Sequence, residues 1–248
     1  MPKKASTKKK APVVLKVRDE DPNENFADIH ENLPQMPSLT LIIGSVRSGK
    51  SNLLVNWFCN PEFYKDKFDV VKFVSTTLNT DNKGKILSKH FDCIDHYEDT
   101  IIADIMKSQG QYENKEDRPT FALVMDDVLT KDFKKTNDVS FFSTRFRHYI
   151  DFYVIAVQSF RAVAGMIRNN ATDVIICKQQ NTKELLKIAE EYGDMVGGQD
   201  NFMKLYEEAM KDRYSFLYLK LSENPAQAFV RFESQIWPPQ KSEELVID

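Results

Sequence analysis

The sequence predicts an α/β fold, in which a central, mainly parallel sheet of five core strands is flanked by helices and followed by a small β extension. Five short runs are rich in β-branched and aromatic residues and almost continuously apolar, which is typical of strands buried on both faces. Segments with helical character separate these runs, and such alternation favours parallel strands with right-handed crossovers. The predicted core strands are 39–43, 70–75, 121–127, 152–157 and 173–177.

The same criteria predict the remaining helices and strands. Helices are expected near 53–58, 86–91, 100–108, 141–148, 160–168, 183–192 and 201–211. In the segment 100–108, for example, apolar residues recur at helical spacing. A two-strand unit at 214–221 and 228–232, with a turn at Asn224–Pro225, forms the expected β extension.

Composition limits the possible classes of protein. A chain of 248 residues with 42% hydrophobic and 29% charged residues has the composition of a globular protein, and no apolar run approaches membrane-spanning length. The net charge is −3, but residues 1–18 hold seven Lys or Arg and no acid. The rest of the chain is therefore acidic, which excludes a globally basic nucleic-acid-binding domain. Three scattered cysteines suit a reducing compartment.

A glycine-rich loop follows the first predicted strand and precedes a predicted helix. It has the pattern G-x-x-x-x-G-K-S, whose glycines allow a sharp turn and whose amides and helix N-terminus bind phosphate oxygens. We expect Lys50 to reach the β- and γ-phosphates and the Ser51 hydroxyl to ligate Mg²⁺. The predicted phosphate-binding residues are Gly44, Ser45, Val46, Arg47, Ser48, Gly49, Lys50 and Ser51.

Polar residues end two further strands. Asp126 and Asp127 end the third, and we expect Asp126 to hold Mg²⁺ through water and Asp127 to orient or deprotonate the attacking water. Gln158 ends the fourth. Ligands bind at the carboxyl ends of parallel strands, so these side chains should meet the phosphate loop there. The pattern predicts an ATP- and Mg²⁺-dependent hydrolase.

The order of these motifs resembles the FtsK–HerA superfamily of DNA-pumping ATPases. The further likeness is an Arg-His pair at 147–148 before the fourth strand and the segment 167–170 after it. Within the superfamily, the genome-packaging ATPases of large DNA viruses and virophages are most similar, over 39–177. The resemblance implies a P-loop NTPase of the ASCE type, with the strand that carries Gln158 between the phosphate-loop strand and the acidic strand.

The resemblance also implies roles for individual residues. Gln158 would sense the γ-phosphate. Asp127 stands where the family usually has Glu, which is one methylene longer and serves as the water-activating base. The family uses an arginine from a neighbouring subunit to stabilise transition-state charge. Arg147 is the first candidate for that arginine and Arg168 the second.

On this resemblance the chain would be a subunit of a ring that hydrolyses ATP to drive double-stranded DNA into a preformed capsid. It would contact DNA phosphates rather than bases, because a packaging motor must accept any sequence. Loops 78–85 and 109–118 are candidate DNA contacts, and a capsid or vertex protein is a further expected partner. The expected setting is the host cytoplasm or a virus factory, or the virion itself.

Three parts are expected along the chain. Residues 1–30 form a basic, then acidic, flexible arm; 31–235 form the P-loop ATPase domain; and 236–248 form a polar tail.

Two other functions fit the same motifs. A small-molecule kinase would share the phosphate loop, although an Arg-rich lid is not evident and the acidic pair favours water as the acceptor. A scaffold that binds ATP without hydrolysing it is the second alternative, because Asp127 replaces the usual Glu.

Overall fold

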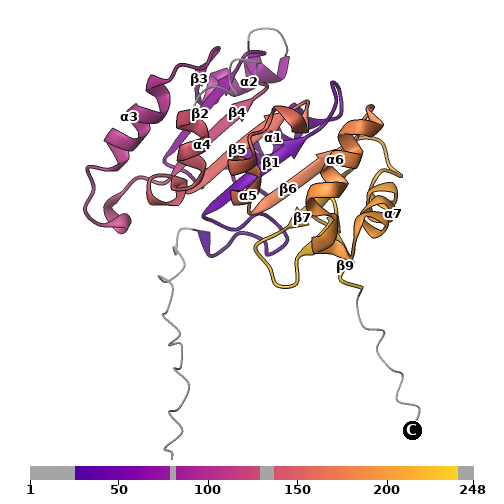
Figure 1. Ribbon diagram of the computed structural model, residues 1–248. Helices are drawn as coiled ribbons and strands as arrows, with labels where there is room; N and C mark the ends of the chain where they lie inside the picture. Colours follow the sequence, from indigo (N-terminus) through magenta and orange to yellow (C-terminus); the bar gives the residue numbers. More distant parts are fainter. Residues whose placement is uncertain (1–25, 79–81, 129–136, 240–248) are drawn as a thin grey trace, which may run out of the picture.

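The computed structural model describes residues 26–78, 82–128 and 137–239, and a nine-stranded sheet runs through them (Figure 1). The strand order is β3-β2-β4-β5-β1-β6-β7-β8-β9. The strands from β3 to β6 in this order are parallel, and those from β6 to β9 pair antiparallel. The strands are β1 (Ser38–Ile43), β2 (Val70–Ser75), β3 (Asp92–Ile94), β4 (Phe121–Asp126), β5 (Phe152–Val157), β6 (Asp173–Cys177), β7 (Phe216–Lys220), β8 (Gln227–Val230) and β9 (Ser234–Trp237).

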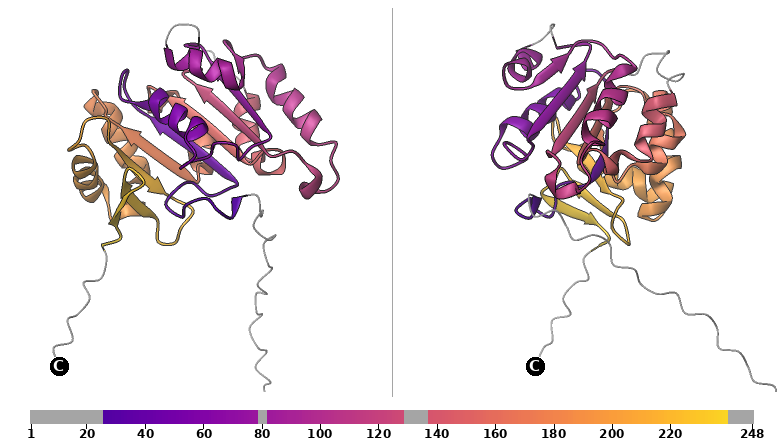
Figure 2. Two further views of the ribbon diagram at one scale, coloured as in Figure 1. Left: turned by 180° about the vertical axis from the view of Figure 1, so that it is seen from behind. Right: turned by 90° about the vertical axis from the view of Figure 1, so that its left-hand side faces the viewer.

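Helices cover both faces of this sheet (Figure 2). One face packs against α1 (Lys50–Cys59) and α2 (Asn82–His90). The other packs against α3 (Thr100–Gln109), α4 (Asn137–Ser143), α5 (Gly165–Asn170), α6 (Thr182–Tyr192) and α7 (Gln199–Ala209). None of the helices in the described ranges has both the length and the apolar character needed to cross a bilayer.

The two hydrophobic clusters explain why the central strands are almost continuously apolar. Leu39 and Leu41 of β1 belong to the cluster under α3 to α7, whereas Ile42 belongs to the cluster under α1 and α2. Successive side chains of a strand point to opposite faces, so a strand that is covered on both sides is apolar at most positions. All six residues of β1 are buried accordingly.

The predicted fold class is confirmed: all five core strands are present, and β5 lies between β4 and β1. The C-terminal extension is larger than predicted. Sequence analysis did not identify β3, which has three residues, or β9. Ile236 and Trp237, which we expected to open the polar tail, lie at the end of β9.

Two predicted helices are interrupted. The helix expected over 141–148 is α4 followed by a 3₁₀ turn at Phe146–His148. Near its end, the hydroxyls of Ser143 and Thr144 donate to backbone carbonyl oxygens three residues earlier, which competes with continuation of the helix. The segment expected as one helix over 160–168 is a 3₁₀ turn at Phe160–Ala162 followed by α5.

Parts of the predicted arm, tail and loops lie outside the described residues. These are 1–25 of the N-terminal arm, which hold the basic run, 240–248 of the C-terminal tail, and 79–81 of the candidate DNA loop 78–85.

Candidate functional site

The phosphate loop joins the carboxyl end of β1 to the start of α1 (Figure 1). Gly44 needs to be glycine because a Cβ there would lie 2.3 Å from Ser48 Oγ and 2.7 Å from Cys177 Cβ. Gly49 has φ 111°, in the left-handed region that side chains disfavour, and directly precedes α1. The first backbone N–H groups of a helix have no intrahelical acceptor, so α1 directs free donors at the space above the loop.

Lys50 is folded back over this loop. Its Nζ donates to the carbonyl oxygen of Gly44 at 2.8 Å and lies 4.0 Å from Oδ1 of Asp127. The side chain is only 6% exposed, although lysine is rarely buried without a partner. Its ammonium group is thus held at the loop, opposite the carboxylate that follows β4.

Burial behind the loop keeps one potentially reactive group neutral. Cys177 ends β6 directly beneath Gly44 and is buried. Burial raises the pKa of its thiol to about 11, although the positive charge of Lys50 acts to lower this pKa. The thiol therefore stays protonated and packs as a small apolar group.

The two carboxylates at the end of β4 differ in their surroundings. Asp126 is buried, and its Oδ2 accepts a hydrogen bond from Ser75 Oγ at 3.3 Å, since β2 and β4 pair Ser75 with Asp126. Asp127 is the next residue and has φ 52°, a left-handed conformation that is uncommon for a non-glycine residue. Its backbone N–H donates to the carbonyl oxygen of Ala156 at 3.0 Å, which ties this turn to β5.

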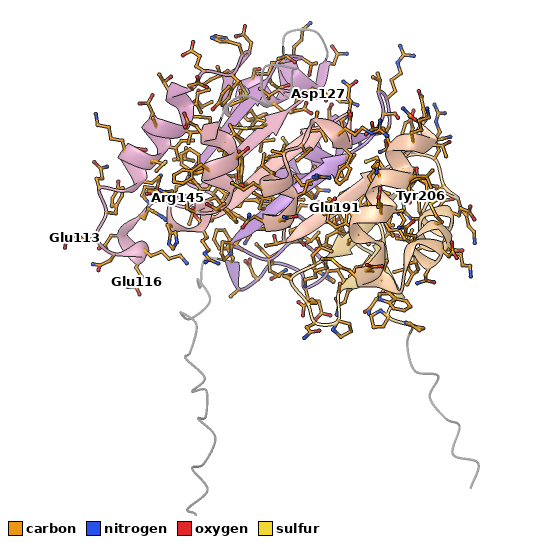
Figure 3. The ribbon with its side chains drawn as sticks, viewed as in Figure 1. Glu113, Glu116, Asp127, Arg145, Glu191 and Tyr206 are labelled. Carbon is orange, nitrogen blue, oxygen red and sulfur yellow. The ribbon has the colours of Figure 1, made fainter. Side chains whose placement is uncertain are left out.

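Gln158 completes a chain of contacts across three strands. Its Nε2 donates to Asp127 Oδ2 at 2.9 Å, while Oδ1 of the same carboxylate faces Lys50. The structure thus brings together Lys50, Asp127 and Gln158, as predicted from the strand ends. Figure 3 shows Asp127 at the edge of the sheet where β4 ends.

Ser51 and Asp126 are the predicted metal ligands. Ser51 is the second residue of α1 and is half-buried, and Asp126 ends β4. No group of three or more His, Cys, Asp or Glu side chains suited to a metal lies in the described ranges. Mg²⁺ bound with a nucleotide does not need such a group, because it takes one or two protein oxygens, phosphate oxygens and water. A hydroxyl and a carboxylate at this edge fit that requirement.

The two candidate arginines lie apart from the loop of their own chain. Arg147 is exposed in the 3₁₀ turn before β5, and β5 begins beside the start of β1, so this turn lies near the end of β1 opposite the loop. Arg168 lies on α5, which precedes β6. Its Nη1 is 2.9 Å from Glu191 Oε2, and its guanidinium lies 4.8 Å from the centroid of the Phe160 ring. Neither contact involves the phosphate loop.

The loop 109–118 is a poor surface for DNA phosphates. Arg118 is buried, donates to the carbonyl oxygen of His148 at 2.6 Å and pairs with Asp151 at 3.4 Å. The exposed charged residues of the loop are one lysine and three acids, and Figure 3 places Glu113 and Glu116 at its outer end. The expectation that this loop contacts DNA is therefore not retained.

Sequence analysis missed a second wall of the site. A cavity of about 430 Å³ lies beside the phosphate loop, and most of its lining comes from the connection between α7 and β7. That connection is polar and has no pattern that distinguishes it from an ordinary turn. The lining residues are Arg47, Ser48, Lys178, Met210, Lys211, Asp212, Arg213, Tyr214 and Ser215.

This chain is similar in sequence to one known viral protein and in architecture to several solved structures. No family model matches the chain. The uncharacterized protein 088R of Invertebrate iridescent virus 3 is 25% identical over 200 residues, which cover 79% of this chain and 72% of that protein.

Two solved structures share the fold. One is the genome packaging NTPase B204 of Sulfolobus turreted icosahedral virus 2 in complex with AMP, at 15% identity and a TM-score of 0.54, with 78% of this chain and 96% of that chain covered. The other is B204, the DNA-packaging ATPase of Sulfolobus Turreted Icosahedral Virus, at 16% identity and a TM-score of 0.54, with 79% and 98% covered. The chain therefore shares the fold of these two structures, a mainly parallel sheet with helices on both faces.

Proposed function

We propose that this chain is the ATP-hydrolysing subunit of a motor that packages double-stranded DNA into a viral capsid. The observation that supports this proposal is the meeting of Lys50, Asp127 and Gln158 around the phosphate loop, from three segments that are separated in sequence. The cation of Lys50 can bind the γ-phosphate, and the carboxylate of Asp127 can orient the attacking water. The amide of Gln158 can sense whether the γ-phosphate is present. The fold shared with B204 supports a packaging role.

The chemistry follows from the groups of the chain. Lys50 would exchange the Gly44 carbonyl for phosphate oxygens and stabilise their charge. Asp127 would orient the attacking water and accept its proton. Gln158 Nε2 donates to Asp127 in this structure and would detect the γ-phosphate by donating its hydrogen bond to a phosphate oxygen instead.

The Ser51 hydroxyl would bind Mg²⁺ directly, and the Asp126 carboxylate would bind it through a water molecule. When bound, Mg²⁺ neutralises charge on the β- and γ-phosphate oxygens.

The positions of the candidate arginines favour action between subunits. Arg147 is exposed and lies toward the end of β1 opposite the loop, so it would act only on the site of a neighbouring copy in a ring. Arg168 is the second candidate, but it would first have to leave Glu191. An arginine supplied in this way couples hydrolysis to subunit contact.

DNA contact is proposed for α2. This helix lies at the edge of the sheet where β2 and β4 end, and its sequence contains Lys83, Lys85 and Lys89 but no acid (Figure 1). Such a surface would bind phosphates without reading bases. A motor of this kind would work in the host cytoplasm or a virus factory, docked on a capsid or vertex protein.

Steady-state ATP hydrolysis with and without linear duplex DNA tests the proposal. The expected result is hydrolysis that DNA stimulates, and loss of that stimulation in a Lys83→Glu/Lys85→Glu/Lys89→Glu variant. A Lys187→Glu variant, altered at an exposed position of α6, is the matched control. Tight ATP binding without turnover would favour a nucleotide-binding scaffold instead. Consumption of a hydroxylated small molecule together with ATP would favour a kinase.

A further inference from the structure

The cavity beside the phosphate loop is not used by the chemistry described above. It lies between Arg47 and Ser48 of the loop, Lys178 after β6, and residues 210–215 before β7. Its volume of about 430 Å³ lies within the range of small-molecule sites.

The position of the cavity relates it to one end of a bound triphosphate. Asp127 and Gln158 follow β4 and β5, which lie on one side of β1 in the sheet. Lys178 and the connection 210–215 adjoin β6 and β7, which lie on the other side. A triphosphate held over the loop with its γ-phosphate at Gln158 would therefore direct its other end toward the cavity.

Tyr214 gives this cavity an aromatic surface. A Cβ added to Gly49 would lie 3.8 Å from both Cβ and Cδ1 of Tyr214, so this residue rests against the phosphate loop. Its φ is 64°, and the residue lines the cavity and is 58% exposed. The guanidinium of Arg213 lies 4.7 Å from the ring centroid. An exposed aromatic face held in place is a stacking platform for a nucleobase, because every base has a π-face.

Ser215 supplies a polar group with no partner. The residue is 2% exposed, and its hydroxyl oxygen is buried and makes no hydrogen bond within the described residues. Buried hydroxyls in proteins are almost always paired, and Ser215 is one of the residues that line the cavity. The other lining charges are four cations and the carboxylate of Asp212, which suits a ligand attached to phosphates.

We propose that this cavity is the nucleoside subsite of the ATPase: Tyr214 stacks on the base, and Ser215 bonds a hydroxyl or ring nitrogen of the nucleoside. The inference rests on the proposed function, since it concerns the other end of the same ligand. A phosphate of DNA is the competing occupant, because the lining is cationic.

Binding of Mg²⁺-ATP and of Mg²⁺-tripolyphosphate, measured by calorimetry, tests the subsite. Tripolyphosphate reproduces the phosphate chain but has no nucleoside. Tyr214→Ala is expected to weaken ATP binding by about tenfold and to leave tripolyphosphate binding within about twofold of the parent. Tyr214→Phe, which keeps the ring, and Tyr112→Ala, at an exposed tyrosine after α3, are the controls and should bind both probes as the parent does.

The possible outcomes separate this inference from the proposed function. Unchanged ATP binding in Tyr214→Ala would overturn the subsite. Equal losses for ATP and tripolyphosphate would also overturn it, because Tyr214 would then only support Gly49. A parent protein that binds both probes equally well would leave phosphate binding intact and remove the nucleoside subsite. A parent that binds neither would overturn both proposals.

Discussion

Gln158 donates a hydrogen bond from Nε2 to Oδ2 of Asp127 at 2.9 Å, so the residue that ends β5 holds the carboxylate that follows β4. The other oxygen of that carboxylate lies 4.0 Å from Lys50 Nζ, whose nearest acceptor is the Gly44 carbonyl at 2.8 Å. Each of the three groups is therefore engaged by protein in this arrangement. A γ-phosphate entering between them would compete for two of these contacts, which gives a local means of registering its arrival and loss.

Lys50→Ala is expected to reduce ATP turnover by at least about 10²-fold, because it removes the ammonium group that lies over the loop, 2.8 Å from the Gly44 carbonyl oxygen. Folding should persist, since Lys50 lies at the rim of the sheet and not in either hydrophobic cluster. Steady-state hydrolysis and circular dichroism measure the two effects, with Lys187→Ala as the surface control. Turnover at the parent rate would show that the site is misassigned.

Asp127→Asn is expected to lower kcat by about 10²-fold while ATP still binds. The amide keeps the shape of the carboxylate and its oxygen can still accept from Gln158, but it cannot take a proton from water. Single-turnover hydrolysis and ATP binding separate the two steps. Asp194→Asn, at an exposed position after α6, is the control. Loss of binding together with turnover would give Asp127 a structural role instead.

Arg147→Ala is expected to lower hydrolysis at least about tenfold in the assembled ring and to have little effect on isolated subunits. Mixing this variant with Lys50→Ala subunits, which retain Arg147, should restore part of the activity. Arg168→Ala is the second candidate, and Arg231→Ala, on the exposed turn after β8, is the control. Mixtures that stay as inactive as their components would argue against an arginine acting between subunits.

Asp173 predicts a pH dependence of stability. Burial raises its pKa above 3.8, although Tyr218, Thr172 and Ser38 donate to its carboxyl oxygens and Lys220 lies nearby. The folded protein therefore binds this proton more tightly than the unfolded chain, and the stability so gained is lost as pH rises from about 3.8 through the folded pKa.

Denaturant unfolding of the parent and of Asp173→Asn across this pH range tests the sign of that effect. The free energy of unfolding of the parent, relative to the variant, should fall as pH rises. Asn removes the titration but keeps an oxygen acceptor, so the difference isolates the carboxyl group. A difference that grows with pH would contradict the assignment.

The strands and the half of the candidate site that is formed by the loop 44–51 and the strand ends were predictable because they depend on local patterns. Long apolar runs identified β1, β4 and β5, and each polar residue that ends such a run lies at the same edge of the parallel sheet. The spacing from Gly44 to Lys50 identified the loop. Gly44 has no room for a Cβ, and Gly49 has a positive φ, so both positions require glycine.

The other half of the site depends on contacts between distant segments. Tyr214 and Ser215 line the cavity beside the loop because β7 pairs antiparallel with β6, and nothing in the polar connection before β7 indicates a ligand. Arg118 was expected on an exposed loop, but it is neutralised by Asp151, 33 residues further along the chain. The sequence alone does not indicate which distant residues form such ion pairs, because the pairing depends on the tertiary structure.

The two edges of the sheet constrain how copies of this protein would assemble. β3 has three residues and β9 has four, so each edge offers few backbone groups for pairing with another chain. Subunits that join through strand addition need a longer free edge than either of these. In the proposed ring, contacts between subunits would then be made by side chains of helices and loops, which could separate and form again without disrupting the sheet.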